Sequence, residues 1–460
     1  MAEPAASLDL TTLRADYLSG RRRPADVVAA ARARISARRD DHVWISLLDD
    51  DAVGAALRRL EGVDPATAPL YGVPFAVKDN IDLAGVPTTA GCPAFAYEPT
   101  QTAPALARAI AAGAIPLGKT NLDQFATGLV GVRSPYGTPV NPFDATMIPG
   151  GSSSGSAVAV AAGLVSFAFG TDTAGSGRVP AALNNLVGLK PSRGLISTRG
   201  VVPACRSLDC VSIFGLTVDD AARVFDVVAA YDPADPFSRS APPIALPLPS
   251  AFRFGVPARA QREFFGNAAG AALFDATIDR LRALGGEPID VDIAPFLEAA
   301  RLLYEGPWVA ERYHAIRDFL AAHADAMHPI TRRIIAGGAE PRAVDAFAAY
   351  YRLRTLQRAV AGIFQGIDVL LTPTIGTGVS VRAVENDPIG LNSQLGHYTN
   401  FMNLLDLCGV AVPAGFQPDG LPFGVTIVAP AFHDARALAV ARRLQVDVGG
   451  RLGATMHTLP

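Results

Sequence analysis

The chain has 460 residues, half of them hydrophobic, and its 40 basic and 43 acidic side chains give a formal net charge of −3. This composition excludes an intrinsically disordered chain, because so many apolar residues can bury enough surface to offset the entropy lost on ordering. The lack of a basic excess argues against a nucleic-acid partner.

The first half of the chain alternates between helical and strand-like patterns. Apolar residues recur at helical spacing within residues 1–60, where Pro24 can open a second helix. Such alternation is typical of an α/β fold with a covered sheet. The elements predicted next are a buried strand over 71–79, a helix over 102–112, a strand over 114–117, a helix over 122–129 and a buried core helix over 157–170.

The second half follows a proline-rich segment, residues 233–249, which predicts a surface connection between two parts of the core. Beyond it the predicted elements are a strand over 252–256, a helix over 264–284, further helices up to about 364, strands over 367–371, 410–412 and 424–428, and a last helix over 434–446. The sequence shows no internal repeat.

Several classes of site are disfavoured by what the sequence lacks. The run 157–170 is shorter than the roughly 20 apolar residues of a membrane span, and the N-terminus has no signal-peptide pattern. The four cysteines form no CxxC pair and the seven histidines no ligand grouping, so we expect neither a metal nor a cofactor. Reduced thiols are typical of cytoplasmic proteins, and that is the expected location.

Three short segments carry candidate chemistry. Lys78 ends the apolar run 74–77, where burial would lower its pKa and provide a neutral amine base, although a surface lysine closing a strand is the simpler interpretation. Two loops rich in glycine and serine follow, over 150–156 and 170–178. Neither loop contains the GxxxxGK[ST] phosphate-binding pattern, which disfavours nucleotide binding at these loops. Neither places a GxSxG segment directly after a strand-like run, as the nucleophile elbow of an α/β-hydrolase requires, so that fold is disfavoured as well.

Taken together, these segments resemble the amidase signature family, which uses a Ser–Ser–Lys triad. The lysine segment GVPFxVKD is matched at residues 72–79, the bridging serine after a Gly-Gly pair at Ser152, and the GTDxxGSxR-like nucleophile loop at Ser176. Residues 187–194 and 422–425 continue the signature.

The resemblance implies a fold as well as a triad. We expect an α/β fold with a large mixed central β-sheet covered by helices on both faces. The amidase signature domain is expected over residues 61–450, with a helical substrate-binding excursion near 290–365, after an N-terminal helical segment over residues 1–60.

The resemblance also assigns a role to each triad residue. Neutral Lys78 would accept a proton from Ser152, which relays the proton of the nucleophile Ser176 and later delivers it to the leaving amine. In the family, the peptide bond before the bridging serine is cis. Arg178 is expected to order the loops rather than to perform chemistry. The oxyanion hole is expected from backbone N–H groups of the nucleophile loop, namely Thr173, Ala174, Gly175 and Ser176.

Two segments, residues 197–210 and 303–313, resemble allophanate hydrolases more than generic amidases. The resemblance implies that Tyr304 and Arg312 hold the substrate, because a guanidinium can grip a planar carboxylate through two parallel hydrogen bonds. The residues alone also allow a plain amphipathic helix, with Tyr304 in the core and Arg312 in a salt bridge. Two further substrate contacts are expected at Gly128 and Ser153.

The expected activity is deamination of allophanate, with release of ammonia through an acyl-Ser176 intermediate. The alternatives are a generic small-amide amidase and the amidase component of a transamidosome, whereas a silent scaffold is disfavoured because all three triad positions are intact. We expect a homodimer, which is common in the family, and no nucleic-acid or membrane partner. Allophanate hydrolases usually continue into a smaller C-terminal domain, which we expect to be absent here.

Overall fold

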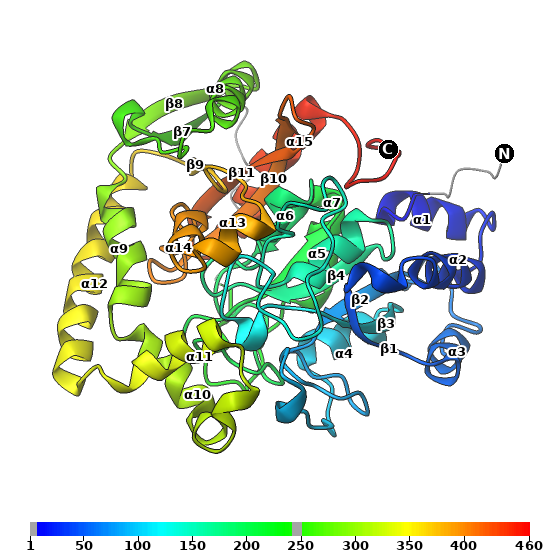
Figure 1. Cartoon of the computed structure of the whole chain (residues 1–460). Coiled ribbons are helices and arrows are strands. Elements are labelled where there is room, and N and C mark those ends of the chain that lie inside the picture. The colour runs from blue at the N-terminus through cyan, green and yellow to red at the C-terminus, as the bar shows by residue number, and fades with distance from the viewer. Residues whose placement is uncertain (1–6, 242–250) are drawn as a thin grey trace.

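The computed structural model describes residues 7–241 and 251–460, and within them eleven strands form one mixed sheet (Figure 1). The strand order is β1-β3-β2-β4-β6-β5-β10-β11-β9-β7-β8. The strands are β1 (Trp44–Leu47), β2 (Pro74–Lys78), β3 (Ile115–Thr120), β4 (Phe167–Thr171), β5 (Val187–Lys190), β6 (Val211–Gly215), β7 (Phe252–Pro257), β8 (Gly286–Val291), β9 (Val369–Pro373), β10 (Leu407–Phe416) and β11 (Pro422–Pro430).

Side chains on successive residues of a strand point to opposite faces, and both faces of this sheet are covered by helices. In β2, Phe75 and Val77 join one hydrophobic cluster, whereas Ala76 joins another. Helices α4 (Pro104–Ala111), α7 (Val218–Val228), α8 (Ala268–Ala283) and α15 (Asp434–Val448) contribute to the first cluster. Helices α2 (Pro24–Ser36), α3 (Asp50–Arg58), α5 (Ser154–Ala161) and α6 (Val179–Leu183) contribute to the second. The predicted α/β fold with a mixed sheet covered on both faces is confirmed.

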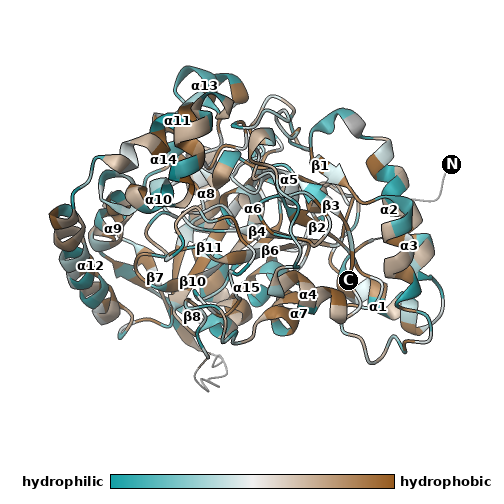
Figure 2. Ribbon diagram, turned by 90° about the horizontal axis from the view of Figure 1, so that it is seen from below, coloured by the Kyte–Doolittle hydropathy of each residue, from teal (hydrophilic) through white to brown (hydrophobic). Residues whose placement is uncertain are grey.

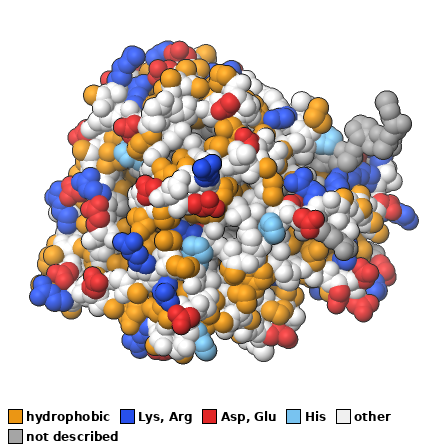
Figure 3. Space-filling view, in the orientation of Figure 1, with side chains coloured by type: hydrophobic (Ala, Val, Ile, Leu, Met, Phe, Trp, Pro, Cys, Tyr) orange, Lys and Arg blue, Asp and Glu red, His pale blue; other side chains and the backbone are white. Residues whose placement is uncertain are grey.

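The hydrophobic residues gather in the strands and the inner faces of these helices, whereas hydrophilic residues are frequent on outer helices such as α3 and α12 (Figure 2). Basic and acidic side chains are interspersed over the surface seen in Figure 3. In the described ranges, 7–241 and 251–460, no helix combines the length and the hydropathy that crossing a bilayer requires.

Four consecutive helices form an excursion beside the sheet (Figure 1). Phe296, Leu303 and Leu356 of this excursion pack in a third hydrophobic cluster with Phe401. The four are α9 (Ala294–Glu305), α10 (Trp308–His323), α11 (Pro329–Ala336) and α12 (Ala343–Ile363). The remaining helices are α1 (Leu10–Leu18), α13 (Val381–Asn386) and α14 (Gly390–Leu395).

The geometry of β2 positions the first candidate residue. Because β2 runs parallel to both β3 and β4, the three strands end at the same edge of the sheet. Val77 pairs with Phe169 of β4, so Lys78 lies beside the end of that strand, where the loop of residues 170–178 begins.

Several predicted elements are wrong. The helix expected over 122–129 is only a short turn, Gln124–Ala126, in which Phe125 and Ala126 have positive φ angles of 52°. Tertiary backbone hydrogen bonds hold this turn, because the N–H of Phe125 donates to the carbonyl of Ala90 and the N–H of Gln124 to that of Arg133, both at 2.8 Å.

Other errors concern short strands. The run 157–170, expected to be one helix, is split between α5 and β4. Strand β1 lies inside the segment expected to be helical, and β8 interrupts the predicted run of helices before 364. Strands β5 and β6 were not predicted, because each has only four or five residues and no polar alternation. Residues 242–250 of the predicted proline-rich connection lie outside the described residues.

Candidate active site

Lys78 lies at the end of β2 with its side chain fully buried. Its Nζ is 2.7 Å from the Ser152 hydroxyl and 2.7 Å from the Thr171 hydroxyl. Burial lowers the pKa of Lys78 to about 7, although the carboxylates of Asp123 and Asp209 oppose this shift. An amine with this pKa is substantially neutral near pH 7, as a general base must be.

Ser152 and Ser153 lie at the start of α5. The Gly151–Ser152 peptide bond is cis, and the carbonyl of Ser152 accepts the N–H of Asp123 at 3.0 Å. The Ser153 hydroxyl donates to the carbonyl of Thr171 at 3.2 Å, so its side chain points at β4. Ser153 therefore supports the residue that shares the Lys78 amine with Ser152.

Ser176 lies in the loop that follows β4, and only 3% of its surface is exposed. Its hydroxyl donates to the carbonyl of Gly128 at 3.5 Å. Among the hydrogen bonds of residues 7–241 and 251–460, none joins Ser176 to Ser152. The structure thus brings Ser176 together with Gly128, and Ser152 together with Lys78.

The backbone of the nucleophile loop presents unused donors. Within the described residues, no hydrogen bond uses the N–H groups of residues 173–176. The amide of Asn403 fixes the loop, because its Nδ2 donates to the carbonyls of Asp172 at 2.7 Å and Thr173 at 3.0 Å. At Gly175, φ is +141° and a Cβ would lie 2.8 Å from the Cβ of Thr399, so only glycine fits.

Arg178 closes the same loop by an ion pair. Its guanidinium donates to both carboxylate oxygens of Asp172, at 2.8 and 2.9 Å, and both side chains are fully buried. A further hydrogen bond joins it to the carbonyl of Thr399 at 3.2 Å. With its charge compensated and its donors directed at the loop, Arg178 is placed to order the backbone around Ser176.

Arg312 and Tyr304 face one another across the helical excursion. The guanidinium carbon of Arg312 lies 5.5 Å from the centroid of the Tyr304 ring, and only 2% of Arg312 is exposed. Its Nη1 donates to the hydroxyl of Thr127 at 3.1 Å, whereas its Nε has no partner. Across the described parts of the chain, Arg312 forms no salt bridge, so the alternative is wrong in placing Arg312 in one, although Tyr304 does pack against the hydrophobic core as it expected.

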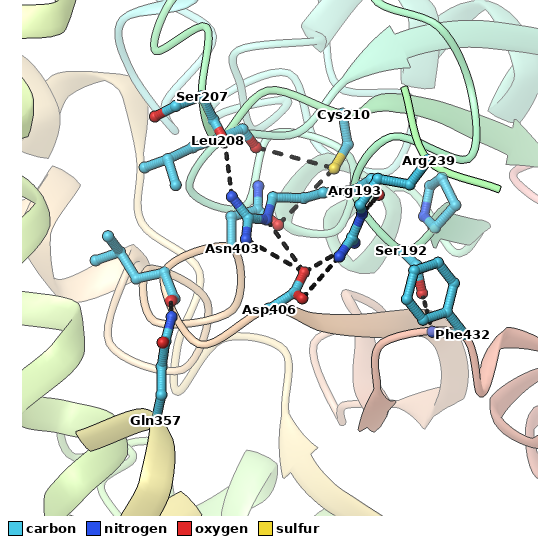
Figure 4. Close-up of polar contacts among 12 residues, drawn as sticks. Ser192, Arg193, Ser207, Leu208, Cys210, Arg239, Gln357, Asn403, Asp406 and Phe432 are labelled. Carbon is cyan, nitrogen blue, oxygen red and sulfur yellow. Dashed lines mark hydrogen bonds and ion pairs between the residues drawn. The ribbon is translucent and has the colours of Figure 1, made fainter. Parts of the chain in front are cut away.

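A polar network holds the helix that carries Arg312. The backbone N–H and hydroxyl of Ser207 donate to the carboxylate of Glu311, at 2.6 and 2.7 Å. On the other side, Arg193 donates to the carbonyl of Ser207 at 2.7 Å and pairs with Asp406 at 3.3 Å (Figure 4). Arg239 also binds Asp406. The loop of residues 197–210 is thereby tied both to α10 and to the sheet.

Sequence reasoning did not single out Thr171, Asp209 or Arg133. Thr171 lies within the loop motif, so its position was a usable signal. Asp209 accepts the hydroxyl of Thr173 and the N–H groups of residues 204 and 205, and burial raises its pKa to about 6. Arg133 donates to the carbonyl of Thr127 at 3.0 Å. No sequence pattern indicated that it would lie near Arg312.

The described residues contain no group of three or more histidine, cysteine, aspartate or glutamate side chains that could hold an ion. The four cysteines are buried and free.

Comparisons with known proteins show which family the chain resembles. A family model described as Amidase matches residues 26–438. The chain is 46% identical over 410 residues to a urea amidolyase of Saccharomyces cerevisiae, a match that covers 88% of this chain and 22% of that protein. It is 34% identical over 441 residues to one subunit of the glutamyl-tRNA(Gln) amidotransferase of Acidobacterium capsulatum, covering 86% of this chain and 90% of that one.

A solved structure also resembles this chain over nearly its whole length. The selenomethionine-substituted allophanate hydrolase of Kluyveromyces lactis superposes with a TM-score of 0.93 at 40% identity, covering 99% of this chain and 76% of that chain. This chain therefore spans most of that structure, but less than a quarter of the length of the urea amidolyase.

Proposed function

The chain belongs to the amidase family, and from this premise we propose that it deaminates allophanate (urea-1-carboxylate) and releases ammonia. The observation that carries the proposal is a pair of buried basic side chains without ion-pair partners in the described residues. One is Lys78, bonded to the hydroxyl of Ser152, and the other is Arg312, bonded to the hydroxyl of Thr127. Lys78 in its neutral form can act as a base, and the guanidinium of Arg312 can bind a carboxylate.

In the proposed acylation step, Ser176 Oγ bonds to the carbonyl carbon of the terminal amide. Its proton passes to Ser152 as the proton of Ser152 passes to neutral Lys78. The N–H groups of residues 173–176 stabilise the oxyanion, which in such sites is worth about 10²- to 10³-fold in rate per donor. We expect substrate binding to draw the hydroxyls of Ser152 and Ser176 together, because catalytic hydrogen bonds often tighten only in the complex.

In the proposed second half of the reaction, Ser152 gives a proton to the amide nitrogen as the C–N bond breaks. Ammonia leaves, and Lys78 returns its proton to Ser152. Water then attacks the acyl carbon with the same proton relay, so that the Ser176 ester is cleaved and N-carboxycarbamate is released. The steps consume one water and yield one ammonia for each allophanate.

For substrate recognition, we assign the allophanate carboxylate to Arg312 and the hydroxyl of Tyr304. Two parallel N–H donors of a guanidinium match the two carboxylate oxygens. The backbone of Gly128, next to Thr127, supplies a further contact beside Ser176. We assign Ser153 a supporting role through Thr171, since its hydroxyl is directed at β4.

The test compares substrates of different chemistry. We expect ammonia release with allophanate and essentially none with fatty or aryl amides, which lack a carboxylate for Arg312. Equal turnover of these substrates contradicts the assignment and favours a generic amidase. Glutamine tests the alternative raised by the amidotransferase relatives, because an enzyme of that kind would release ammonia from glutamine. The Ser176→Ala variant serves as the blank.

Two further expectations stay predictions. A homodimer would give twice the chain mass by light scattering. The cytoplasmic location can be checked by fractionation of the native cells.

A further inference from the structure

Two buried guanidinium groups meet at one threonine. Arg133 is 1% exposed and Arg312 is 2% exposed. Nη1 of Arg133 donates to the carbonyl of Thr127 at 3.0 Å, and Nη1 of Arg312 donates to its hydroxyl at 3.1 Å. Thr127 precedes Gly128, whose carbonyl accepts the Ser176 hydroxyl. Both cations are thus one residue away from the backbone that contacts the expected nucleophile.

Neither guanidinium has an internal counter-ion in contact with it. Within residues 7–241 and 251–460, no salt bridge involves Arg133 or Arg312, and the Nε of each lacks a hydrogen-bond partner. Buried charges are costly unless they are paired. Burial lowers the pKa of Arg133, and the like charge of Arg312 acts in the same direction.

The nearby carboxylates are committed elsewhere. Asp123 accepts the backbone N–H groups of Val130, Gly131 and Arg133. Asp209 accepts the hydroxyl of Thr173 and two further backbone N–H groups. These acids reduce the positive potential around the two guanidiniums, but none of them accepts a hydrogen bond from Nε of Arg133 or of Arg312 in the described residues.

Arg133 is also placed where a small ligand can approach. A cavity of about 370 Å³ is lined by Arg133, Tyr304, Asn392 and Ser393, with Glu305 and Glu340 also on its wall. The guanidinium of Arg312 lies against the Tyr304 ring. The cavity therefore borders Arg133 and Tyr304 directly, and Arg312 only through its contact with Tyr304.

An anchoring role is the alternative for Arg133. Its Nη2 donates to the carbonyl of Pro388 at 2.5 Å, and its Nη1 to that of Thr127, so it ties two loops together. An anchoring role would require only hydrogen-bond donors. It does not explain why a second positive charge is buried near Arg312.

We propose that Arg133 is a specificity-determining residue that acts with Arg312 to favour carboxylate-bearing ligands over neutral amides of the same shape. The inference rests on the proposed function for the identity of the substrate, but its physical content is an anion preference that is measurable without turnover. Arg133 acts through its charge and through Thr127, whereas Arg312 makes the direct contact.

The test measures binding of malonate, a dianion, and malonamide, its neutral diamide, by calorimetry. We expect Arg133→Gln to weaken malonate binding at least tenfold and to leave malonamide binding within twofold of wild type. Arg133→Lys keeps the charge and should recover most of the malonate affinity. Arg436→Gln is the matched control, because Arg436 is largely buried but paired with Asp368 at 3.2 Å, and it should leave the malonate-to-malonamide ratio unchanged.

Three results would overturn the proposal. They are an unchanged malonate affinity in a folded Arg133→Gln variant, an equal loss for both ligands, and no preference for malonate in the wild-type protein. Failure of the proposed function looks different. In that case the wild type prefers malonate and the Arg133 variants behave as expected, yet allophanate releases no ammonia.

Discussion

Lys78 and Lys119 are fully buried near the ends of neighbouring parallel strands, yet their surroundings differ. Nζ of Lys119 forms an ion pair with Asp79 at 3.1 Å. Among the described residues, Nζ of Lys78 has only the hydroxyls of Ser152 and Thr171 as partners. The same contrast separates Arg178, paired with Asp172, from Arg312, which has no ion pair in the described residues.

The difference between these cations separates structural groups from candidate functional ones. A buried cation that is ion-paired with a carboxylate holds its loop or strand in place. Its charge is already balanced within the protein, so it does not require a ligand. Burial lowers the pKa of both lysines, but Lys119 faces a carboxylate whereas Lys78 faces hydroxyls, and Arg312 keeps its Nε without a partner in the described residues. Because both kinds of cation lie in the same region of the protein, substitutions at paired cations should lower stability, whereas substitutions at unpaired ones should lower activity or ligand affinity.

The largest effect on turnover is expected at the proposed nucleophile, which belongs to neither the lysine pair nor the arginine pair compared above. Ser176→Ala removes the atom that forms the acyl intermediate, and turnover should fall by about 10⁴-fold or more. Ligand binding should persist, because the alanine leaves Arg312 and Tyr304 unchanged. Ammonia release in single-turnover and steady-state assays measures the first effect, and calorimetry with malonate the second. Substantial residual turnover would identify another nucleophile.

Next in size is the uncompensated lysine. Lys78→Ala removes the proposed base, and kcat should fall by about 10³-fold, within the usual range for general acid–base catalysis. The free energy of unfolding should change little or increase, because a buried amine without an ion pair is itself unfavourable. Stopped assays combined with denaturant unfolding test both parts. A drop in kcat that merely follows lost folding would remove the base assignment.

The compensated lysine should give the opposite pattern. Lys119→Met leaves the carboxylate of Asp79 buried and unpaired, which typically costs about 3–5 kcal/mol in the free energy of unfolding. The kcat per folded molecule should stay close to that of wild type. The double variant Asp79→Asn with Lys119→Met should regain stability, because no buried charge is left. A normal stability for the single variant would contradict the contrast between the two lysines.

Arg312→Ala should raise KM for allophanate by about 10²-fold, because removing one partner of a buried charged hydrogen bond costs about 2–5 kcal/mol. The kcat at saturation should fall less. Biuret, which has an amide where allophanate has its carboxylate, is the neutral control and should show a much smaller change. A KM for allophanate equal to that of wild type would take Arg312 out of the site.

The smallest expected effect is the pH dependence. Because the pKa of Lys78 is about 7, the amine is neutral above that pH and protonated below it. The kcat/KM should therefore rise through pH 7 and fall about tenfold for each pH unit further into acid. Asp209, whose pKa is raised to about 6, becomes protonated as the pH falls through the same range. A flat profile between pH 6 and 8 would exclude a titrating lysine base.

Part of the fold and site could be predicted from residue patterns. The strand ending at Lys78 and the late strands could be predicted, because apolar runs bounded by glycine and proline are typical of buried strands. The family resemblance supplied Ser152, Ser176 and Arg312. The turn at Gln124–Ala126 was mistaken for a helix, because its backbone is fixed by hydrogen bonds to Ala90 and Arg133 and not by local propensity.

By itself, the sequence determined the α/β class, the family and the residue types that the chemistry needs, since these depend on motifs and on local periodicity. Only the tertiary structure decided which buried cations are compensated. Lys119 meets Asp79, whereas Lys78 meets two hydroxyls, although both lysines lie near the ends of buried strands. Arg133 and Arg312 meet at Thr127 from distant parts of the chain. The reason is physical: burial and charge pairing depend on neighbours in space, which spacing along the chain does not specify.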